Sequence, residues 1–127
     1  MDLSIIIHDR LAADTAVAAI VGTRIHLEES PDDADLPLIV YAVRLGDSID
    51  GSALVAPATV TVHGYASSDD TAQSLGAAIN ACLEGNGGIS GTTRLRSLTL
   101  TAWDEARSFE ENLWGRLLTF AGTVIRG

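Results

Sequence analysis

The sequence has a single cysteine among its 127 residues, which excludes a disulfide within one chain. It has only three prolines, and 46% of its residues are hydrophobic, a composition that is typical of a folded domain and excludes a disordered chain. We expect one domain over residues 1–127. Folding at this length buries roughly two-thirds of the chain's surface, so the core needs neither disulfides nor a structural metal.

Long apolar runs are also absent. No segment approaches the roughly 20 apolar residues that are needed to cross a bilayer. The first residues, MDLSIIIHDRL, lack the basic start and the long apolar region of a signal peptide. We therefore expect a soluble protein that is made and used in the cytoplasm and has no membrane partner.

Basic residues are scarce as well, since 8 of them stand against 17 acidic residues and give a formal net charge of -9. A surface with this balance repels phosphate backbones, which argues against specific binding of nucleic acid. Arg94 and Arg96 alternate with Leu95 and could form a small basic stripe on a strand. Solvated arginines at a strand edge are the favoured interpretation, because strands commonly alternate in this way.

The hydrophobic periodicity predicts helices in two regions. Residues 2–20 have apolar side chains at helical spacing, with Asp14 placed to cap a second short helix that ends at Gly22, so this region is one broken helix or two consecutive ones. Residues 67–88 form the other helix, which Ser68, Asp69 or Asp70 caps. Cys82 falls on its apolar face, where we expect a buried, inert thiol.

Alternating or continuous apolar residues predict the strands. These cover residues 23–29, 37–45, 58–66, 94–104 and 113–125. We expect residues 37–45 and 58–66 to form one hairpin, with its tip from about Gly46 to Pro57, and the last two strands to form another through residues 105–112. The predicted fold class is α+β: a mostly antiparallel sheet of four to five strands with helices packed on one face, in the order α-β-β-β-α-β-β.

No pattern in the sequence predicts catalysis, a cofactor or a metal site. The GDSIDG loop holds Asp47 and Asp50 but lacks the alternating oxygen ligands and distal glutamate of a calcium loop. The GGISG stretch is out of step with a nucleophile elbow, and its glycines follow a helix, whereas a phosphate-binding loop precedes one. The remaining acidic and histidine candidates fall in one loop or on separate elements: Asp32, Asp33, Asp35, His8, His26 and His63. We therefore expect a protein that is not an enzyme.

Aromatic residues allow two alternative interpretations as binding sites. Trp103 and Trp114 fall on adjacent predicted strands and could form a stacking site, although core or subunit-interface anchors are the favoured interpretation. The alternative of a small-ligand-binding domain places a pocket between sheet and helix that gathers His63, Tyr65 and Asp104.

The order and spacing of three features resemble the tail-completion or tail-terminator proteins of tailed bacteriophages and prophages. These features are the short helix that ends in VGT before RI, the strand LPLIVY, and the strand TVTVHGYA that runs into an alanine-rich helix. The resemblance spans nearly the whole chain and implies an α+β structural subunit of the virion with no catalytic residues.

That resemblance implies a ring of identical subunits, commonly a hexamer, that caps the head-proximal end of the tail tube. The ring ends tube polymerisation and offers a surface for joining the tail to the head. Implied partners are other copies of the chain, the tail tube protein and a head-connector or head-closure protein, while DNA passes through the lumen. The alternative within the same setting is another neck component, such as a head-closure or connector protein.

A ring protein contacts several partners through different surfaces, and loops on a rigid sheet commonly make such contacts. We expect the loop after residue 46 to be a docking arm that is mobile in the free subunit and becomes ordered on contact with tube protein. The residues expected to contact a tube subunit or a neighbour are Asp47, Ser48, Ile49, Asp50, Leu54 and Val55.

Overall fold

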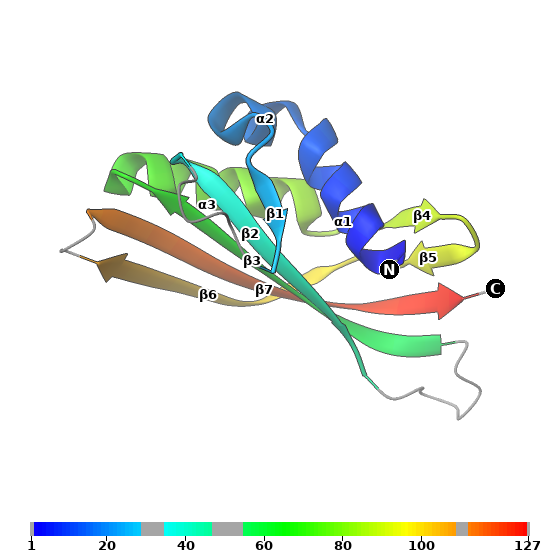
Figure 1. The fold of residues 1–127 in the computed structure, drawn as a ribbon. Helices are drawn as coiled ribbons and strands as arrows, with labels where there is room; N and C mark the ends of the chain where they lie inside the picture. Colours follow the sequence, from blue (N-terminus) through cyan, green and yellow to red (C-terminus); the bar gives the residue numbers. More distant parts are fainter. Residues whose placement is uncertain (1, 29–34, 47–54, 109–111, 127) are drawn as a thin grey trace.

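The computed structural model describes residues 2–28, 35–46, 55–108 and 112–126, which form three helices and a curled, mixed sheet of the α+β class (Figure 1). The helices are α1 (Asp2–Ala13), α2 (Thr15–Val21) and α3 (Asp69–Leu83). The strands are β1 (Ile25–Leu27), β2 (Leu38–Leu45), β3 (Val55–Ala66), β4 (Gly88–Ser90), β5 (Thr93–Leu95), β6 (Thr99–Ser108) and β7 (Leu113–Arg126). None of the helices in these ranges is long and apolar enough to span a membrane.

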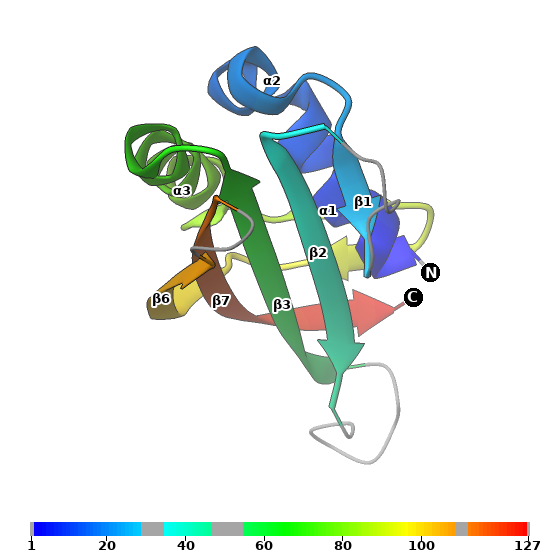
Figure 2. The same ribbon diagram turned by 60° about the vertical axis from the view of Figure 1, so that its left-hand side comes forward.

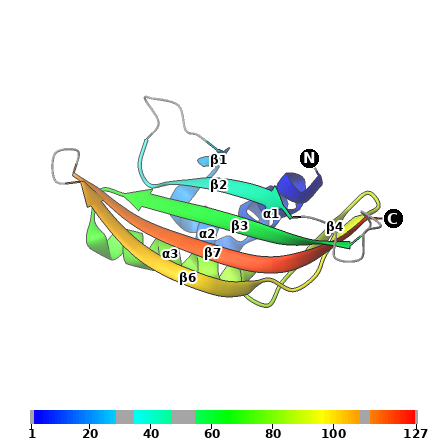
Figure 3. The same cartoon turned by 90° about the horizontal axis from the view of Figure 1, so that it is seen from below.

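The seven strands follow the order β1-β2-β3-β7-β5-β4, and β6 pairs with β7 beside β5. Only β1 and β2 are parallel; every other pairing of named strands is antiparallel. The predicted hairpin of β2 and β3 is confirmed, with Val43 opposite Val60, and so is the hairpin of β6 and β7. Four strands, β2, β3, β7 and β6, therefore lie side by side as the main body of the sheet (Figure 3).

The predicted count of four to five strands and the order α-β-β-β-α-β-β are wrong in their detail. The expected strand 94–104 is interrupted between Leu95 and Thr99, although β5 and β6 pair with successive stretches of β7. The interruption lies where Leu98 pairs with the segment after α3: its amide donates a hydrogen bond to the Asn86 carbonyl at 3.0 Å. The three-residue β4 was not predicted, since so short a segment has no measurable alternation.

The chain after β6 also differs from the prediction. Residues 105–108 were expected in the connection of the second hairpin, but they continue β6 as far as Ser108. Their charged side chains are compatible with a strand because β6 lies at the outer edge of the sheet, where such side chains reach solvent.

The helix boundaries follow the caps in the sequence. The N-terminal region forms two consecutive helices, since the Asp14 carboxylate accepts a hydrogen bond from the Val17 amide at 3.0 Å and starts α2. Gly22 ends α2 with a φ of 60°, a conformation that favours glycine. In α3 the cap is Ser68, whose hydroxyl accepts a hydrogen bond from the Thr71 amide at 3.2 Å, while Asp69 and Asp70 lie in the first turn.

All three helices pack on the same face of the sheet, and Figure 3 shows the opposite face in front of them. The core lies between these layers. It contains Leu3, Ile7 and Leu11 from α1, Leu75, Ile79 and Leu83 from α3, and Val60, Val62, Leu118 and Phe120 from the sheet. The prediction of helices on one face is confirmed, and Figure 2 shows α2 at the top of the view, above α3 and α1.

Two glycines bring α3 close to the sheet. A Cβ on Gly64 of β3 would lie 2.9 Å from Cδ2 of Leu75, which leaves no room for a larger residue. A Cβ on Gly76 of α3 would lie 3.1 Å from the ring of Trp103 and 3.2 Å from Cβ of Arg116. These contacts fix the distance between the helix and the strands.

Replacing Gly64 tests this close approach. We expect Gly64→Ala to lower the free energy of unfolding by about 1–3 kcal/mol, because the added methyl overpacks the contact with Leu75. Thr61→Ala, on the other face of the same strand, serves as the control and should cost less than about 1 kcal/mol. Urea unfolding of both variants measures the difference, and a Gly64→Ala protein as stable as the parent would contradict the packing described.

Candidate functional site

The sheet face that no described helix covers is the candidate functional site of the chain. We call it the open face, and the strand register defines it, because side chains alternate between the two faces. On β3, Val60 and Val62 point into the core, whereas Thr61 and His63 point to the open face. The central part of the open face, to which the name refers below, consists of Val40, Ala42, Arg44, Thr59, Thr61, His63, Tyr65, Ala102, Asp104, Ala106, Gly115, Leu117, Thr119 and Ala121.

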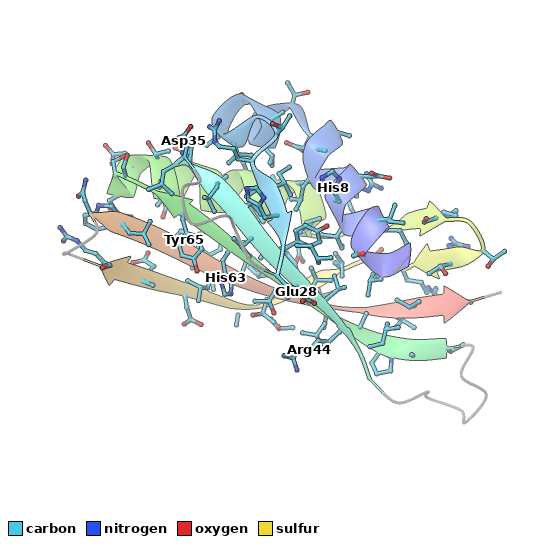
Figure 4. All side chains as sticks on the ribbon, in the orientation of Figure 1. His8, Glu28, Asp35, Arg44, His63 and Tyr65 are labelled. Carbon is cyan, nitrogen blue, oxygen red and sulfur yellow. The ribbon has the colours of Figure 1, made fainter. Side chains whose placement is uncertain are left out.

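Formal charge is scarce on the open face. Apart from His63, only Arg44 and Asp104 among its residues are ionisable at neutral pH, in a chain with a net charge of -9. The two lie at opposite edges, Arg44 on β2 and Asp104 on β6, and Figure 4 shows Arg44 projecting away from the helices. Between them lie Thr, Ala, Val, Leu and Gly residues and the pair of His63 and Tyr65. Depletion of charge over such an area is typical of the centre of a protein–protein interface.

His63 and Tyr65 form a pair on the open face (Figure 4). The Nδ1 atom of His63 lies 3.1 Å from the Tyr65 hydroxyl, and the two rings meet edge to face with centroids 6.0 Å apart. Burial lowers the pKa of His63 and raises the pKa of Tyr65 from their ordinary values. The imidazole is therefore held toward its neutral form, which suits a surface that another protein covers.

The predicted pocket of His63, Tyr65 and Asp104 between sheet and helix is wrong. All three lie on the open face, and Leu117 of β7 stands between His63 and Asp104 in the register. The physical reason is the alternation of β3, which turns His63 away from the helices when Val62 faces them. A cavity of about 160 Å³ does lie beside Tyr65, over Gly115 and Ala106, but its lining includes neither His63 nor Asp104.

The two tryptophans lie on the helix-facing side of the sheet. Trp103 packs against the core beside Gly76, which confirms the prediction of a core anchor for this residue. Trp114 is half-buried, and the Arg107 guanidinium lies 3.7 Å from the centre of its ring. The register places the tryptophans about four residues apart along β7, or roughly 13 Å, so they do not form a common stacking site.

Arg116 is a buried arginine that was not predicted from the sequence. Arg116 of β7 is only 3% exposed, and its guanidinium contacts Asp69 of α3 at 2.5 Å, Gln73 of α3 at 3.3 Å and Glu105 of β6 at 3.5 Å. One side chain thus joins the first turn of α3 to the two last strands. The only signal was an arginine at an inward position of the strand LWGRLLTF, between apolar neighbours.

Of the residues predicted for the docking loop, the structure describes only Val55. Asp47, Ser48, Ile49, Asp50 and Leu54 lie outside the described residues, as do Asp32 and Asp33. Val55 is the first residue of β3 and pairs with Ile125. The Gly46 amide donates a hydrogen bond to the Pro57 carbonyl at 2.8 Å, so the two ends of the loop lie close together at one end of the sheet.

Other candidate residues are spread over the structure. His8, His26 and His63 lie on α1, β1 and β3, and Asp35 is exposed before β2. Across the described part of the chain, no three His, Cys, Asp or Glu side chains come together in a way that could hold a metal ion. Arg94 and Arg96 are exposed on either side of buried Leu95, as expected of solvated arginines.

Cys82 is buried against α1, and its thiol donates a hydrogen bond to the Arg10 carbonyl at 3.3 Å. Burial, with a smaller contribution from Asp14, raises the pKa of Cys82 to about 11. The thiolate is the reactive form of cysteine. The prediction of a buried, inert thiol is therefore confirmed.

Comparison with known proteins agrees with the fold. The family model described as tail completion protein gp17 matches residues 6–124. Among solved structures, one chain described as belonging to the virion of a native gene transfer agent particle superimposes with a TM-score of 0.82. That match covers 98% of this chain and 95% of the other at 21% sequence identity, so it shows a shared fold. No curated protein sequence matches the chain.

The ion pair of Arg116 and Asp69 can be tested by removing one charge. We expect Asp69→Asn to lower the free energy of unfolding by about 1–3 kcal/mol, because the buried guanidinium loses its nearest carboxylate. Asp70→Asn is the matched control, since Asp70 shares the first turn of α3 and should contribute only about 0.5 kcal/mol there. Equal losses in the two variants, measured by urea unfolding, would contradict the role of the ion pair.

The environment of His63 makes stability depend on pH. Because burial lowers its pKa in the folded chain, the unfolded chain binds more protons between that value and the ordinary 6.5. Stability should therefore fall as the pH falls through this window, and His63→Gln should make the fall shallower. Urea unfolding at about pH 7.5 and about pH 5.5 measures the slope. His8→Gln, at an exposed position of α1, controls for the loss of one histidine, and the account is wrong if both variants change the slope equally.

Proposed function

The chain belongs to the tail completion protein gp17 family, and on that premise we propose that it caps the head-proximal end of a tail tube as a ring of identical subunits. It is a structural protein of a phage-type tail. In the proposed role the ring, commonly a hexamer in proteins of this kind, stops the polymerisation of the tube. Its other side provides the surface to which the head is joined.

The observation that carries this proposal is the open face. A sheet with helices on one side only leaves a broad surface that can contact other proteins, and this one has formal charge only at its two edges. A chain with a net charge of -9 has charged residues to place there, yet the centre of the face consists of Thr, Ala, Val, Leu and Gly residues with the pair of His63 and Tyr65. Such a surface favours contact with a protein over contact with solvent.

The proposed partners are other copies of the chain, the tail tube protein and a head-connector or head-closure protein. The segment from Asp47 to Leu54, followed by Val55 at the start of β3, is the proposed docking arm for tube or neighbouring subunits. Support for this comes from its place between two long paired strands, which hold its ends together at Gly46 and Pro57. A rigid base of this kind lets a loop project toward a partner.

The acidic charge fits the proposed passage of DNA. Phosphate contacts with basic residues are what hold nucleic acid, and their strength grows with the number of such contacts. A lumen with few basic groups lets DNA pass without binding it tightly. The alternative assignment within the same assembly is another neck component, such as a head-closure or connector protein, because the open face would serve either position.

A charge placed in the centre of the open face tests the proposal. We expect Leu117→Glu to fold but to fail in capping, so that tail tube protein polymerised in its presence gives tubes of uncontrolled length in electron micrographs. The parent protein should stop growth and be seen at one end. Ala77→Glu, on the exposed side of α3, is the control and should cap as the parent does.

Circular dichroism and thermal unfolding of Leu117→Glu check that the variant is folded. A folded Leu117→Glu protein that still caps tubes would rule out the open face as the functional surface. A parent protein that never associates with tube ends, but joins purified connector rings, would favour the other neck component.

A further inference from the structure

The outer edge of β6 has no strand partner in the described part of the chain, although the Leu100 amide donates a hydrogen bond to the Glu84 carboxylate. β6 has ten residues, and it pairs with β7 on one side only (Figure 3). The other outer strands, β1 and β4, have three residues each. Soluble proteins commonly protect a long edge with proline, charged side chains, a bulge or a covering segment. β6 contains no proline, and its register irregularity lies near Leu100, so the part from Trp103 to Ser108 is protected only by charged side chains.

The opposite side of the sheet offers a second free edge. β1 pairs with β2 only from Ile39 to Tyr41, and the ladder ends where the Glu28 amide donates to the Tyr41 carbonyl at 2.7 Å. Glu28 has a φ of 66°, a left-handed conformation outside the range of strand residues, so the strand does not continue through it. In the described ranges, Ala42 to Leu45 therefore pair with β3 alone.

The strand directions suit a head-to-tail contact between these two edges. β2, β3, β7 and β6 alternate in direction, because each pairing among them is antiparallel. β2 and β6 therefore run in opposite directions. When a second copy is placed with its β2 beside β6 in the same orientation, the new pairing is antiparallel and the helices of both copies stay on one side.

Side chains match in one register of this pairing. If Asp104 stands opposite Arg44 of the next copy, an acidic and a basic residue of the two open faces meet. Neither has an ion pair with another described residue in the single chain. On the helix-facing side the same register places half-buried Trp103 opposite half-buried Leu45. Opposite charges and apolar pairs directly across a ladder both stabilise it.

The same register is compatible with the closure of several subunits into a ring. Within one chain, Asp104 lies in the same row across the sheet as Val40, through Leu117 and His63. In the proposed pairing Asp104 lies opposite Arg44 instead, so each copy is displaced by four residues, about 14 Å, along the strands relative to its neighbour. The four strands of one copy span about 19 Å across the sheet. The strands are then tilted by about 35° to the ring axis, within the range in which closed sheets form.

We propose that β6 of one subunit pairs antiparallel with the Ala42–Leu45 edge of β2 in the next copy, with Asp104 opposite Arg44. The inference rests on the proposed ring, for which it supplies the contact between subunits. The contact uses two different edges, so it is heterologous and generates a ring or a helix of subunits rather than a two-fold dimer.

Disulfide cross-linking tests the pairing directly. Within one subunit, residues 44 and 104 are on strands three spacings apart, at least about 14 Å, which is too far for a disulfide. We expect a mixture of the Arg44→Cys and Asp104→Cys proteins to give a covalent dimer on mild oxidation, and the double variant Arg44→Cys/Asp104→Cys to give a ladder of multimers. The parent protein, with Cys82 buried, should give neither.

A matched control uses Val40→Cys with Asp104→Cys. Val40 lies on the same strand and face as Arg44, but β1 covers that part of the edge, so no cross-link is expected. Charge exchange gives a second readout: Arg44→Asp and Asp104→Arg should each lower the association constant about tenfold. The variant that carries both changes should recover association.

Several results would overturn the pairing. A covalent dimer of Asp104→Cys alone would mean that two β6 edges pair about a two-fold axis. Cross-links that fail to form both in the concentrated protein and with tail tube subunits would also exclude it. Rings seen by electron microscopy without the expected cross-link would exclude this strand pairing and leave the proposed function intact. A cross-linked protein that does not cap tail tubes would support the pairing and contradict the proposed function.

Discussion

The close packing of α3 on the sheet decides which surfaces the domain leaves for partners. Gly64 and Gly76 let the helix approach the strands, and the Arg116 guanidinium joins its first turn to β7 and β6 through Asp69 and Glu105. With α1 and α2 on the same side, every described helix covers one face. The opposite face and the two outer strands of the main sheet are therefore available for contacts with other chains.

This one-sided packing gives the domain several different surfaces for contacts with other chains. A subunit of an assembly needs stable surfaces that differ from one another, and the fold provides a weakly charged face and two unlike edges. Arg44 marks one edge and Asp104 the other, on the same face. The net charge of -9 disfavours contact with phosphate backbones.

Much of the fold could be predicted from local patterns in the sequence. The alternation around Val60 and Val62 gave the strand and its buried face, and Asp14 and Ser68 gave the starts of α2 and α3. The interruption of the strand 94–104 could not be predicted, because it depends on the contact of Leu98 with Asn86, which follows α3.

The candidate site was harder to predict for the same reason. The alternative pocket of His63, Tyr65 and Asp104 is wrong, and the alternation with Val60 and Val62 already placed His63 on the face opposite the core. Arg116 gave no distinct signal, since its partners come from segments far apart in the sequence.

The mass of the purified chain in solution, measured by light scattering over a concentration series with and without polymerising tail tube protein, tests the central claim most directly. The account predicts a discrete species at a fixed multiple of the 13.3 kDa chain, alone or when tube protein is present. A chain that stays monomeric at every concentration and ignores tube protein would contradict it.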